Sequence, residues 1–229
     1  MTRRFYAAAT AAKQEDGHAI LLDGRPVRTP AKAPLRLPSA NLAAAIAAEW
    51  AAQGETVRPE SMPLTGLANA AIDLVLPDPA AFAAPLAQYG ESDLLYYRGE
   101  DPALVARQAE QWNPILAWAE RRYGVEFTIV QGIMFAPQPV ETLARLNEAL
   151  AALSPFRLAA MAPFVTIGGS LVCALALESN AFAPEALWSA VNLDELWQEE
   201  RWGPDTEAIA VRERRAADWS SAARFLSLL

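Results

Sequence analysis

The sequence contains very few of the side chains on which most enzymes depend. Its 229 residues include one cysteine, Cys173, and one histidine, His18. A single cysteine excludes a disulfide within the chain and is typical of a reducing compartment. Every histidine-based metal site and every Ser-His-Asp or Cys-His catalytic group would have to use the same imidazole. The sequence therefore disfavours most common hydrolase designs.

Cys173 and His18 both have a simple structural interpretation. Cys173 lies in the apolar run SLVCALAL, which predicts a buried thiol rather than a nucleophile. His18 follows Asp16-Gly17, a pair typical of hairpin turns, so we expect its imidazole to lie exposed beside a turn. Gly168-Gly169 lacks both the G-x-G-x-x-G spacing and a preceding strand, which favours close helix packing over a nucleotide site. We therefore expect no metal and no cofactor.

Positive charge is also in short supply. The chain carries 19 Lys and Arg against 27 Asp and Glu, for a formal net charge of −8. Such a chain is poorly suited to nucleic acid or to an anionic membrane surface, and a protein partner with basic patches fits it better. The N-terminal run MTRRFYAAAT has two arginines with no long apolar core after them, so a secretory signal is not expected.

One charge-free stretch is nominally long enough to span a bilayer. Leu158–Leu177 has 20 residues without a charge. However, Pro163 and Gly168-Gly169 interrupt it. These residues break helices, so the stretch predicts two buried helices that meet at a break rather than a transmembrane span. We expect no stable insertion into a membrane.

The predicted fold class is α+β, with a boundary at a shift in composition near residues 75–80. Residues 1–76 are expected to form a small N-terminal α+β domain, and residues 77–229 a mostly helical C-terminal domain. In the C-terminal domain one helix is expected over about residues 102–123, ended by Gly124. In the N-terminal domain Asp-Gly turns separate short strands. These are Phe5-Tyr6, His18–Leu22, Pro26–Thr29 and Leu35–Leu37.

Two helices are expected after these strands. Ser39 is a good N-cap for a helix that runs to about Gln53, with Gly54 as its stop. Trp50 shares the apolar face of this helix, so we expect it to anchor the helix to the small sheet. A second helix follows Met62-Pro63, where apolar residues recur at helical spacing. The residues to which we assign a structural role in this domain are Gly24, Arg25, Glu49 and Trp50.

The most unusual segment is PEALWSAVNLDELWQEERW at residues 184–202, which predicts one long helix. On a helical projection Asp194 and Gln198 fall inside an apolar stripe, and Glu195 lies at its margin. An unpaired buried charge is too costly to leave uncompensated. The acids therefore either form internal ion pairs, contact a partner protein, or act in catalysis. The arginines available for an internal pair are Arg201, Arg212, Arg214 and Arg215.

Several motifs resemble those of one family, the chaperones for the α subunit of the F1-ATPase, which is the catalytic sector of ATP synthase. They are RRFY at 3–6, LLDGRPVRTPAK at 21–32, LPSANLAAAIAAEWAAQGETVRPESMPLTGLANAAID at 37–73, ESDLLYYR at 91–98, RQ…WNPILAW at 107–118, and GGSLVCALAL followed by LDELWQEERWGPD at 193–205. They occur in order over about residues 3–205, so the resemblance covers nearly the whole chain.

The resemblance implies a non-enzymatic assembly chaperone with two parts. Members of the family hold the newly made α subunit, prevent its subunit interface from self-associating, and release it as the hexamer assembles. The family's C-terminal acidic motif implies a partner-binding role for Asp194, Glu195, Gln198 and Trp202, although Leu196 replaces its third acidic position. Because the family-like pattern begins at Arg4, a bacterial cytoplasmic location is expected.

Two other classes of function remain open at this point. One is a general protein-interaction adaptor with another client. The other is a carboxylate-dependent hydrolase centred on Asp194, Glu195 and Asp205. Identification of the bound client would separate the chaperone from the adaptor, and a concave pocket with a raised carboxyl pKa would favour the hydrolase.

Overall fold

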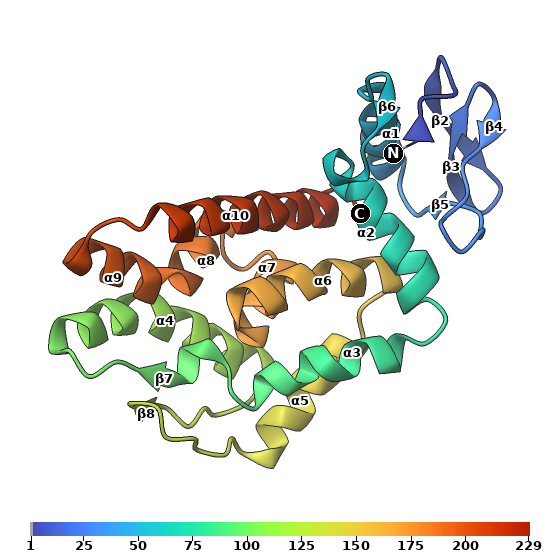
Figure 1. Ribbon diagram of the computed structural model, residues 1–229. Helices are drawn as coiled ribbons and strands as arrows, with labels where there is room; N and C mark the ends of the chain where they lie inside the picture. The colour runs from blue at the N-terminus through green and yellow to red at the C-terminus, as the bar shows by residue number, and fades with distance from the viewer. Residues whose placement is uncertain (1) are drawn as a thin grey trace. The chain divides into compact units, whose positions relative to one another are not determined.

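The computed structural model describes residues 2–229 (Figure 1). The chain forms two compact units. The first unit comprises Met1–Pro79, Ser154–Ala160 and Ser221–Leu229, and the second comprises Ala80–Leu153 and Met161–Ser220. The first unit contains the larger sheet, and the second is predominantly helical, so the predicted α+β class is confirmed. The predicted boundary between independent domains after residue 76 stays a prediction.

The first unit is built on an antiparallel sheet around one central strand. Strand β3 (Gly17–Leu22) pairs with β2 (Ala9–Gln14) along its whole length, and with β4 (Arg25–Pro26) and β5 (Arg36–Leu37) on its other side. The β2–β3 turn needs glycine at position 17, because its φ is +127° and a Cβ there would lie 2.7 Å from the carbonyl oxygen of Leu37. A second, two-stranded sheet joins β1 (Thr2–Arg3) to β6 (Thr56–Val57).

The strand predictions are correct where the sequence has a strong β pattern. The strand predicted at His18–Leu22 is confirmed, whereas Phe5-Tyr6 has no strand structure. Strand β2 was not predicted, because ATAAKQ contains few residues with β propensity. The prediction of an exposed His18 is wrong: the side chain is half-buried, because pairing on both sides of β3 covers it.

Helices α1 (Ala40–Ala51) and α2 (Pro63–Ala70) pack together in this unit, and α1 covers β2 and β3. Ser39 caps α1 as predicted, because its hydroxyl accepts a hydrogen bond from the Leu42 backbone N–H at 3.0 Å. The helix ends at Ala52 in right-handed geometry, so Gly54 does not terminate it. Glu49 joins the two helices: its carboxylate accepts hydrogen bonds at 2.8 Å from the backbone N–H groups of Leu64 and Thr65.

A short helical segment lies at each end of α2 and connects it to the rest of the chain. A 3-10 turn (η1, Pro59–Ser61) precedes α2, and a π-helical turn (η2, Ala71–Val75) follows it. The end of the chain also belongs to the first unit, where the Ser39 hydroxyl donates a hydrogen bond to the Leu228 carbonyl oxygen.

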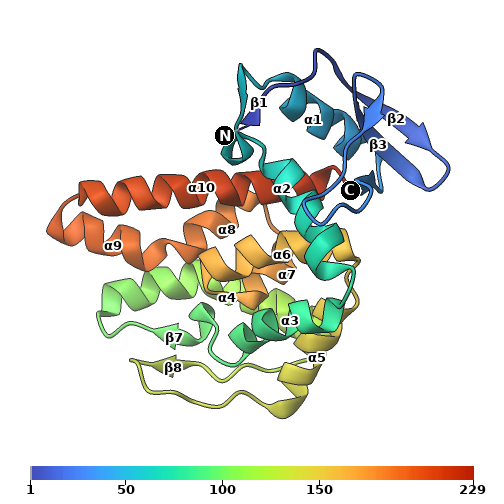
Figure 2. The same cartoon turned by 45° about the vertical axis from the view of Figure 1, so that its right-hand side comes forward.

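The second unit packs helices around α7 (Leu171–Glu178), whose residues are nearly all buried and which contacts α4, α5 and α8 (Figure 2). Helix α4 has the predicted ends, since Asp101 caps it and Gly124 terminates it with a φ of +66°. A short parallel pair, β7 (Tyr97–Arg98) with β8 (Val130–Gln131), lies at the edge of the unit. The helices assigned wholly or partly to this unit are α3 (Pro79–Ala87), α4 (Pro102–Tyr123), α5 (Val140–Ala151), α6 (Pro155–Gly168), α7, α8 (Pro184–Val191), α9 (Leu193–Trp202) and α10 (Thr206–Ser227), with 3-10 turns η3 (Gln88–Gly90) and η4 (Leu94–Tyr96).

The charge-free stretch Leu158–Leu177 forms two mostly buried helices that break at Gly169, as predicted. Gly168 permits close packing there, because a Cβ would lie 3.1 Å from the Trp219 ring and 3.2 Å from Val191. Within residues 2–229 no single helix has the length and apolar character to cross a membrane. One pair, Pro63–Val75 with Pro79–Tyr96, meets that test only when combined, and it is bent by 109°.

Asp93 is a fully buried carboxylate that holds the centre of the second unit together. It accepts hydrogen bonds at 3.0 Å from the backbone N–H groups of Leu95 and Val172, and further ones from Ser170 and Leu171. Burial raises its pKa from 3.8 to about 6, although these hydrogen bonds act in the opposite direction. Cys173 lies beside it, and the predicted buried thiol is confirmed. Burial also raises the pKa of that thiol far above its ordinary value.

Candidate protein-binding surface

The segment predicted as one helix over residues 184–202 is two helices, so that prediction is wrong. Helices α8 and α9 are separated at Asn192, which has a φ of −102° and a ψ of 7°. The buried Asn192 side chain donates a hydrogen bond to the Trp188 carbonyl oxygen at 2.8 Å, which stabilises the break. The helical projection of residues 184–202 treats them as one continuous helix, so it places the side chains of α9 on the wrong faces. Gln198 lies exposed rather than inside an apolar stripe, and Trp202 at the end of α9 is exposed as well.

Asp194, in the first turn of α9, is half-buried and hydrogen-bonded inside the unit. Its Oδ1 accepts a hydrogen bond from Gln108 Nε2 on α4 at 2.7 Å. Burial raises the pKa of this carboxyl, whereas the Gln108 bond and the nearby Arg98 charge lower it. Arg98 is itself buried, with its guanidinium 4.9 Å from the centre of the Trp112 ring and bonded to Asn113 at 2.8 Å. Asp194 thus ties α9 to a polar network under the surface.

Glu195 forms an ion pair with one of the four arginines that the sequence offered. Arg212 on α10 donates to Glu195 at 2.8 Å and to Glu199 at 2.5 Å, so one guanidinium joins two carboxylates of α9. The bonds to Glu199 and Glu195 raise the pKa of Arg212. Both carboxylates remain partly accessible. The pair therefore orders the acids of α9 without removing them from the surface.

Two further arginines fix the outer part of α9. Arg107 and Arg201 lie on the Trp197 ring, with guanidinium carbons 4.7 and 4.8 Å from its centre. Arg107 pairs with Glu200 at 2.7 Å, and Arg201 pairs with Asp101 at 2.8 Å. Both guanidinium groups thus contact the indole, and the two ion pairs attach α9 to α4 and to Asp101, the N-cap of α4.

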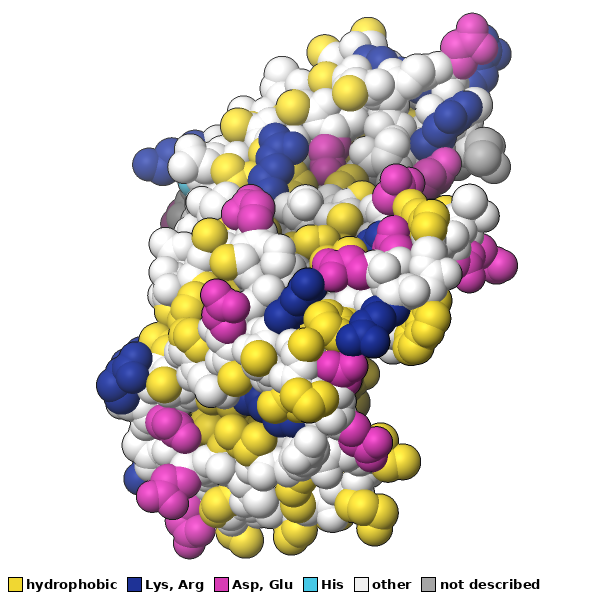
Figure 3. All heavy atoms as spheres, turned by 90° about the vertical axis from the view of Figure 1, so that its left-hand side faces the viewer, with side chains coloured by type: hydrophobic (Ala, Val, Ile, Leu, Met, Phe, Trp, Pro, Cys, Tyr) yellow, Lys and Arg dark blue, Asp and Glu magenta, His cyan; other side chains and the backbone are white. Residues whose placement is uncertain are grey.

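Large apolar side chains lie exposed on the same unit. Trp202 at the end of α9 is 79% exposed, and in the segment after β8 Ile133, Met134 and Phe135 are 96%, 78% and 65% exposed. No charged residue occurs from Thr128 to Val140. Figure 3 shows the side of the molecule that is on the left in Figure 1. Hydrophobic side chains gather along its lower edge, at the height of β7 and β8 in Figure 1. Exposed apolar area of this kind marks protein contact sites.

The carboxylates that a hydrolase would require all have structural partners. Asp194 is bonded to Gln108, Glu195 to Arg212, and Asp205 to the backbone N–H groups of Glu207 and Ala208 at 2.8 and 3.3 Å. Within residues 2–229, no three or more His, Cys, Asp and Glu side chains are placed together as a metal site would need.

The eight residues singled out from the sequence fall into two groups. Asp194, Glu195, Gln198 and Trp202 all lie on α9, in the second unit. Gly24, Arg25, Glu49 and Trp50 lie in the first unit, where Arg25 and Trp50 line one cavity. Sequence reasoning missed Gln108 and Arg98, which are far from α9 in the chain and have no local signal that links them to Asp194.

Comparison with known proteins identifies the family. Residues 3–120 match the family described as ATP12 chaperone protein, which is more than half of the chain. The chain belongs to the ATP12 chaperone family. The crystal structure of Atp12 from Paracoccus denitrificans has a TM-score of 0.95 and 43% sequence identity, covering 99% of this chain and 98% of that chain.

Two more relatives agree with this assignment. A solved structure described as a putative chaperone from Agrobacterium tumefaciens has a TM-score of 0.93 and 41% identity, covering 99% of this chain and 85% of that chain. Protein atp12, mitochondrial, from Schizosaccharomyces pombe is 28% identical over 223 residues, which is 91% of this chain and 76% of that protein. This ATP12-family member is a molecular chaperone for assembly of the F1 sector of ATP synthase.

Proposed function

We propose that this chaperone binds the unassembled α subunit of F1 in the bacterial cytoplasm, shields its subunit interface, and catalyses no reaction. The observation that carries the proposal is the exposure of Trp202 on α9, the helix that also carries the ordered acids Glu195 and Glu199. An unassembled subunit exposes a wide apolar interface that would otherwise aggregate. Exposed tryptophan is typical of the residues that dominate binding energy at such contacts.

The acids of α9 would add selectivity to this contact. Glu195 and Glu199 share Arg212, so their positions are fixed before a partner arrives. Gln198, between them in sequence, is exposed and can donate or accept hydrogen bonds. Acidic groups on the surface of a chain with a net charge of −8 favour a client with a basic patch. Asp194 has a positioning role, because it holds α9 on α4 through Gln108.

Reversal of the Glu195 charge should abolish protection of the α subunit while leaving the protein folded. In Glu195→Lys the new ammonium lies beside Arg212, which keeps its bond to Glu199. We expect a loss of about 1–2 kcal/mol in the free energy of unfolding, between the values for exposed and buried pairs. Charge reversal at an interface should cost several kcal/mol of binding. Melting curves and suppression of α-subunit aggregation measure the two effects.

Glu55→Lys is the matched control, since Glu55 is an exposed glutamate of the first unit. It makes the same change in net charge and should leave both stability and protection near the wild-type values. Normal protection by Glu195→Lys would contradict a contact role for α9. A loss of about 3–5 kcal/mol of stability would instead show that the Glu195–Arg212 ion pair serves the fold rather than a contact with the client.

The purified chaperone should neither bind nor hydrolyse ATP. Its sequence has no P-loop lysine motif, and Gly168-Gly169 lies between packed helices. Isothermal titration with ATP and magnesium should give no saturable heat, and phosphate release should not exceed that of buffer. Saturable binding at micromolar ATP would count heavily against a passive holding mechanism.

Identification of the client separates this proposal from a general adaptor. Affinity purification from the native organism, followed by mass spectrometry, should recover the α subunit of F1 in near-equimolar amount. Recovery of a different protein, with no α subunit present, would leave an F1 assembly role but refute the proposed client.

A further inference from the structure

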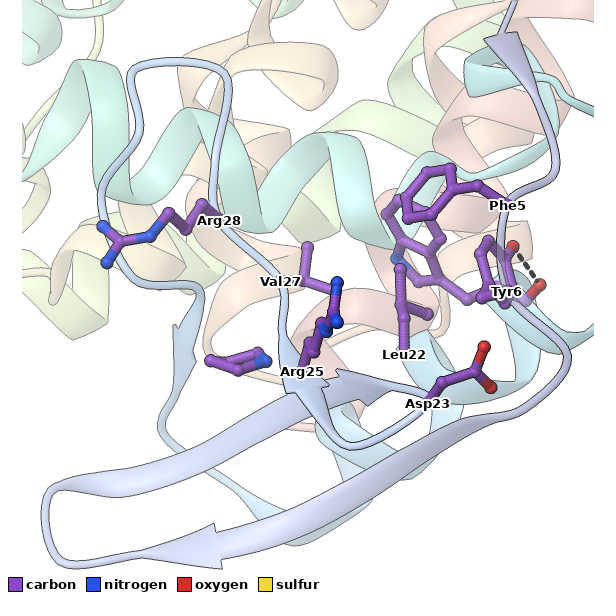
Figure 4. A pocket seen from close by; sticks show the side chains of 9 residues that line it. Phe5, Tyr6, Leu22, Asp23, Arg25, Val27 and Arg28 are labelled. Atoms are coloured by element: carbon purple, nitrogen blue, oxygen red, sulfur yellow. Dashed lines mark hydrogen bonds between the residues drawn. The ribbon is translucent and has the colours of Figure 1, made fainter.

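The first unit contains two cavities that meet at one tryptophan. The first, of about 570 Å³, is lined by residues that include Phe5, Tyr6, Leu22 and Trp50 (Figure 4). The second, of about 320 Å³, is lined by residues that include Val57 and Met62. Trp50 and Arg28 line both cavities. The two cavities are therefore neighbouring parts of one groove, which we call the Trp50 groove.

The walls of the Trp50 groove carry polar groups without partners. The Trp50 Nε1–H is buried and has no hydrogen-bond acceptor among the described residues. In the second cavity the Asn69 Oδ1 is likewise buried without a donor. Buried polar groups are almost always paired in folded proteins, so an unpaired donor and an unpaired acceptor in one groove suggest a missing ligand with both kinds of group. A peptide backbone offers both.

The charge of the groove is opposite to that of the whole chain. Its charged lining residues are Arg25, Arg28 and Asp23, which sum to +1, whereas the chain has a net charge of −8. Asp23 is already engaged, because its carboxylate accepts hydrogen bonds from the backbone N–H groups of Ala7 and Ala8. Those hydrogen bonds, with smaller effects of Arg4 and Arg25, lower its pKa.

The two arginines retain free donors. The Arg25 side chain forms no hydrogen bond or ion pair with any described residue, although its backbone pairs with β3. Figure 4 shows its side chain pointing between Val27 and Leu22, into the first cavity. Arg28 donates one hydrogen bond to the Lys32 carbonyl oxygen at 2.8 Å, and its other donors stay available. An acceptor with negative charge would satisfy them best.

The apolar part of the groove is also incompletely covered. Phe5 is 70% exposed at the rim, although its ring packs against Tyr6 with centres 5.4 Å apart. Tyr6 in turn packs against Trp50 at 5.7 Å, and its hydroxyl donates to the Trp50 carbonyl oxygen at 2.7 Å. These edge-to-face contacts and the hydrogen bond hold the indole in place where the two cavities meet. A large apolar side chain of a ligand would cover Phe5.

We propose that the Trp50 groove binds an extended segment of the client polypeptide that carries a carboxylate next to large apolar side chains. Alternate side chains of an extended segment point the same way, so two of them can enter the two cavities on either side of Trp50. Its backbone carbonyl oxygens and N–H groups are the partners that Trp50 Nε1 and Asn69 Oδ1 lack. Its carboxylate pairs with Arg25. This site rests on the proposed function, since the segment belongs to the F1 α subunit.

Overlapping synthetic peptides that cover the α-subunit sequence test this site. The readout is the indole N–H resonance of Trp50 in the NMR spectrum of the full chain, assigned by its absence in Trp50→Phe. Peptides that combine an acidic and a large apolar residue should shift it. Arg25→Gln should weaken their binding about tenfold, the usual effect of losing one charge-assisted hydrogen bond. Arg214→Gln, at an exposed arginine of the second unit, should bind as wild type.

Several outcomes would overturn the site. They are a Trp50 resonance that no peptide shifts, equal shifts from basic peptides or from ATP, and equal effects of Arg25→Gln and Arg214→Gln. Binding of the intact α subunit is measured in parallel. If that binding is absent, the proposed function fails; if it is present while the Trp50 resonance stays unchanged, only the groove is refuted.

Discussion

Replacement of Asp93 by alanine should lower the free energy of unfolding by about 3–5 kcal/mol, because it leaves several buried donors unpaired. The donors are the backbone N–H groups of Leu95 and Val172, with Ser170 and Leu171 beside them. Leu95 lies in η4, and the other donors lie at the start of α7, the most buried helix of the second unit. Urea unfolding followed by circular dichroism measures the loss.

Glu91→Ala is the control for this variant, since Glu91 is an exposed carboxylate two residues away. It should change the stability by less than about 0.5 kcal/mol. An equal effect of the two variants would show that Asp93 does not hold α7 in place.

The dependence of stability on pH gives an independent check on Asp93. Its pKa is raised from 3.8 to about 6, so between these values the folded protein binds the proton more tightly than the unfolded chain. The Asp93 carboxyl therefore contributes to the free energy of unfolding below about pH 4. This contribution decreases as the pH rises toward 6, by about 3 kcal/mol at most. Asp93→Asn cannot ionise, so the difference between the wild type and this variant should follow that pH course.

Replacement of Trp202 by serine should weaken binding of the α subunit by about thirtyfold or more, as expected for an exposed tryptophan at a binding hot spot. The side chain is 79% exposed, so the melting temperature should stay close to that of the wild type. Surface plasmon resonance with immobilised α subunit measures the affinity. The matched control is Leu74→Ser, at a large apolar residue of the first unit that is 61% exposed.

If Trp202→Ser and Leu74→Ser weaken binding equally, general surface hydrophobicity would explain the contact and α9 would have no special role. If neither variant weakens it, the contact would lie elsewhere on the chaperone, and the exposed segment Ile133–Phe135 would be the next surface to substitute.

Local sequence signals were sufficient for the best predictions of the fold. Asp101-Pro102 and Gly124 fix the two ends of α4, because an N-cap and a left-handed C-cap depend on residues at the ends themselves. Ser39 predicts the start of α1 for the same reason. The break between α6 and α7 follows from Gly169, which has a φ of +64°.

The remaining errors arise where distant residues decide the outcome. The break at Asn192 has no glycine or proline to mark it, so the sequence predicts one helix over residues 184–202 and places Gln198 inside its apolar stripe. Strand β2 forms because its neighbour β3 supplies a partner, not because of its own residues. The Trp50 groove joins residues from the N-terminus, from β4 and from α1, and no local pattern indicates such a cavity.

The central claim is that this protein holds the unassembled α subunit of F1, and one aggregation experiment tests it most directly. Denatured α subunit is diluted into buffer with the purified chaperone, without ATP, and light scattering is followed over time. We predict that an equimolar amount of chaperone suppresses the scattering and keeps the α subunit competent to assemble with its partner subunits. Unchanged aggregation, or equal suppression of unrelated denatured proteins, would contradict the claim.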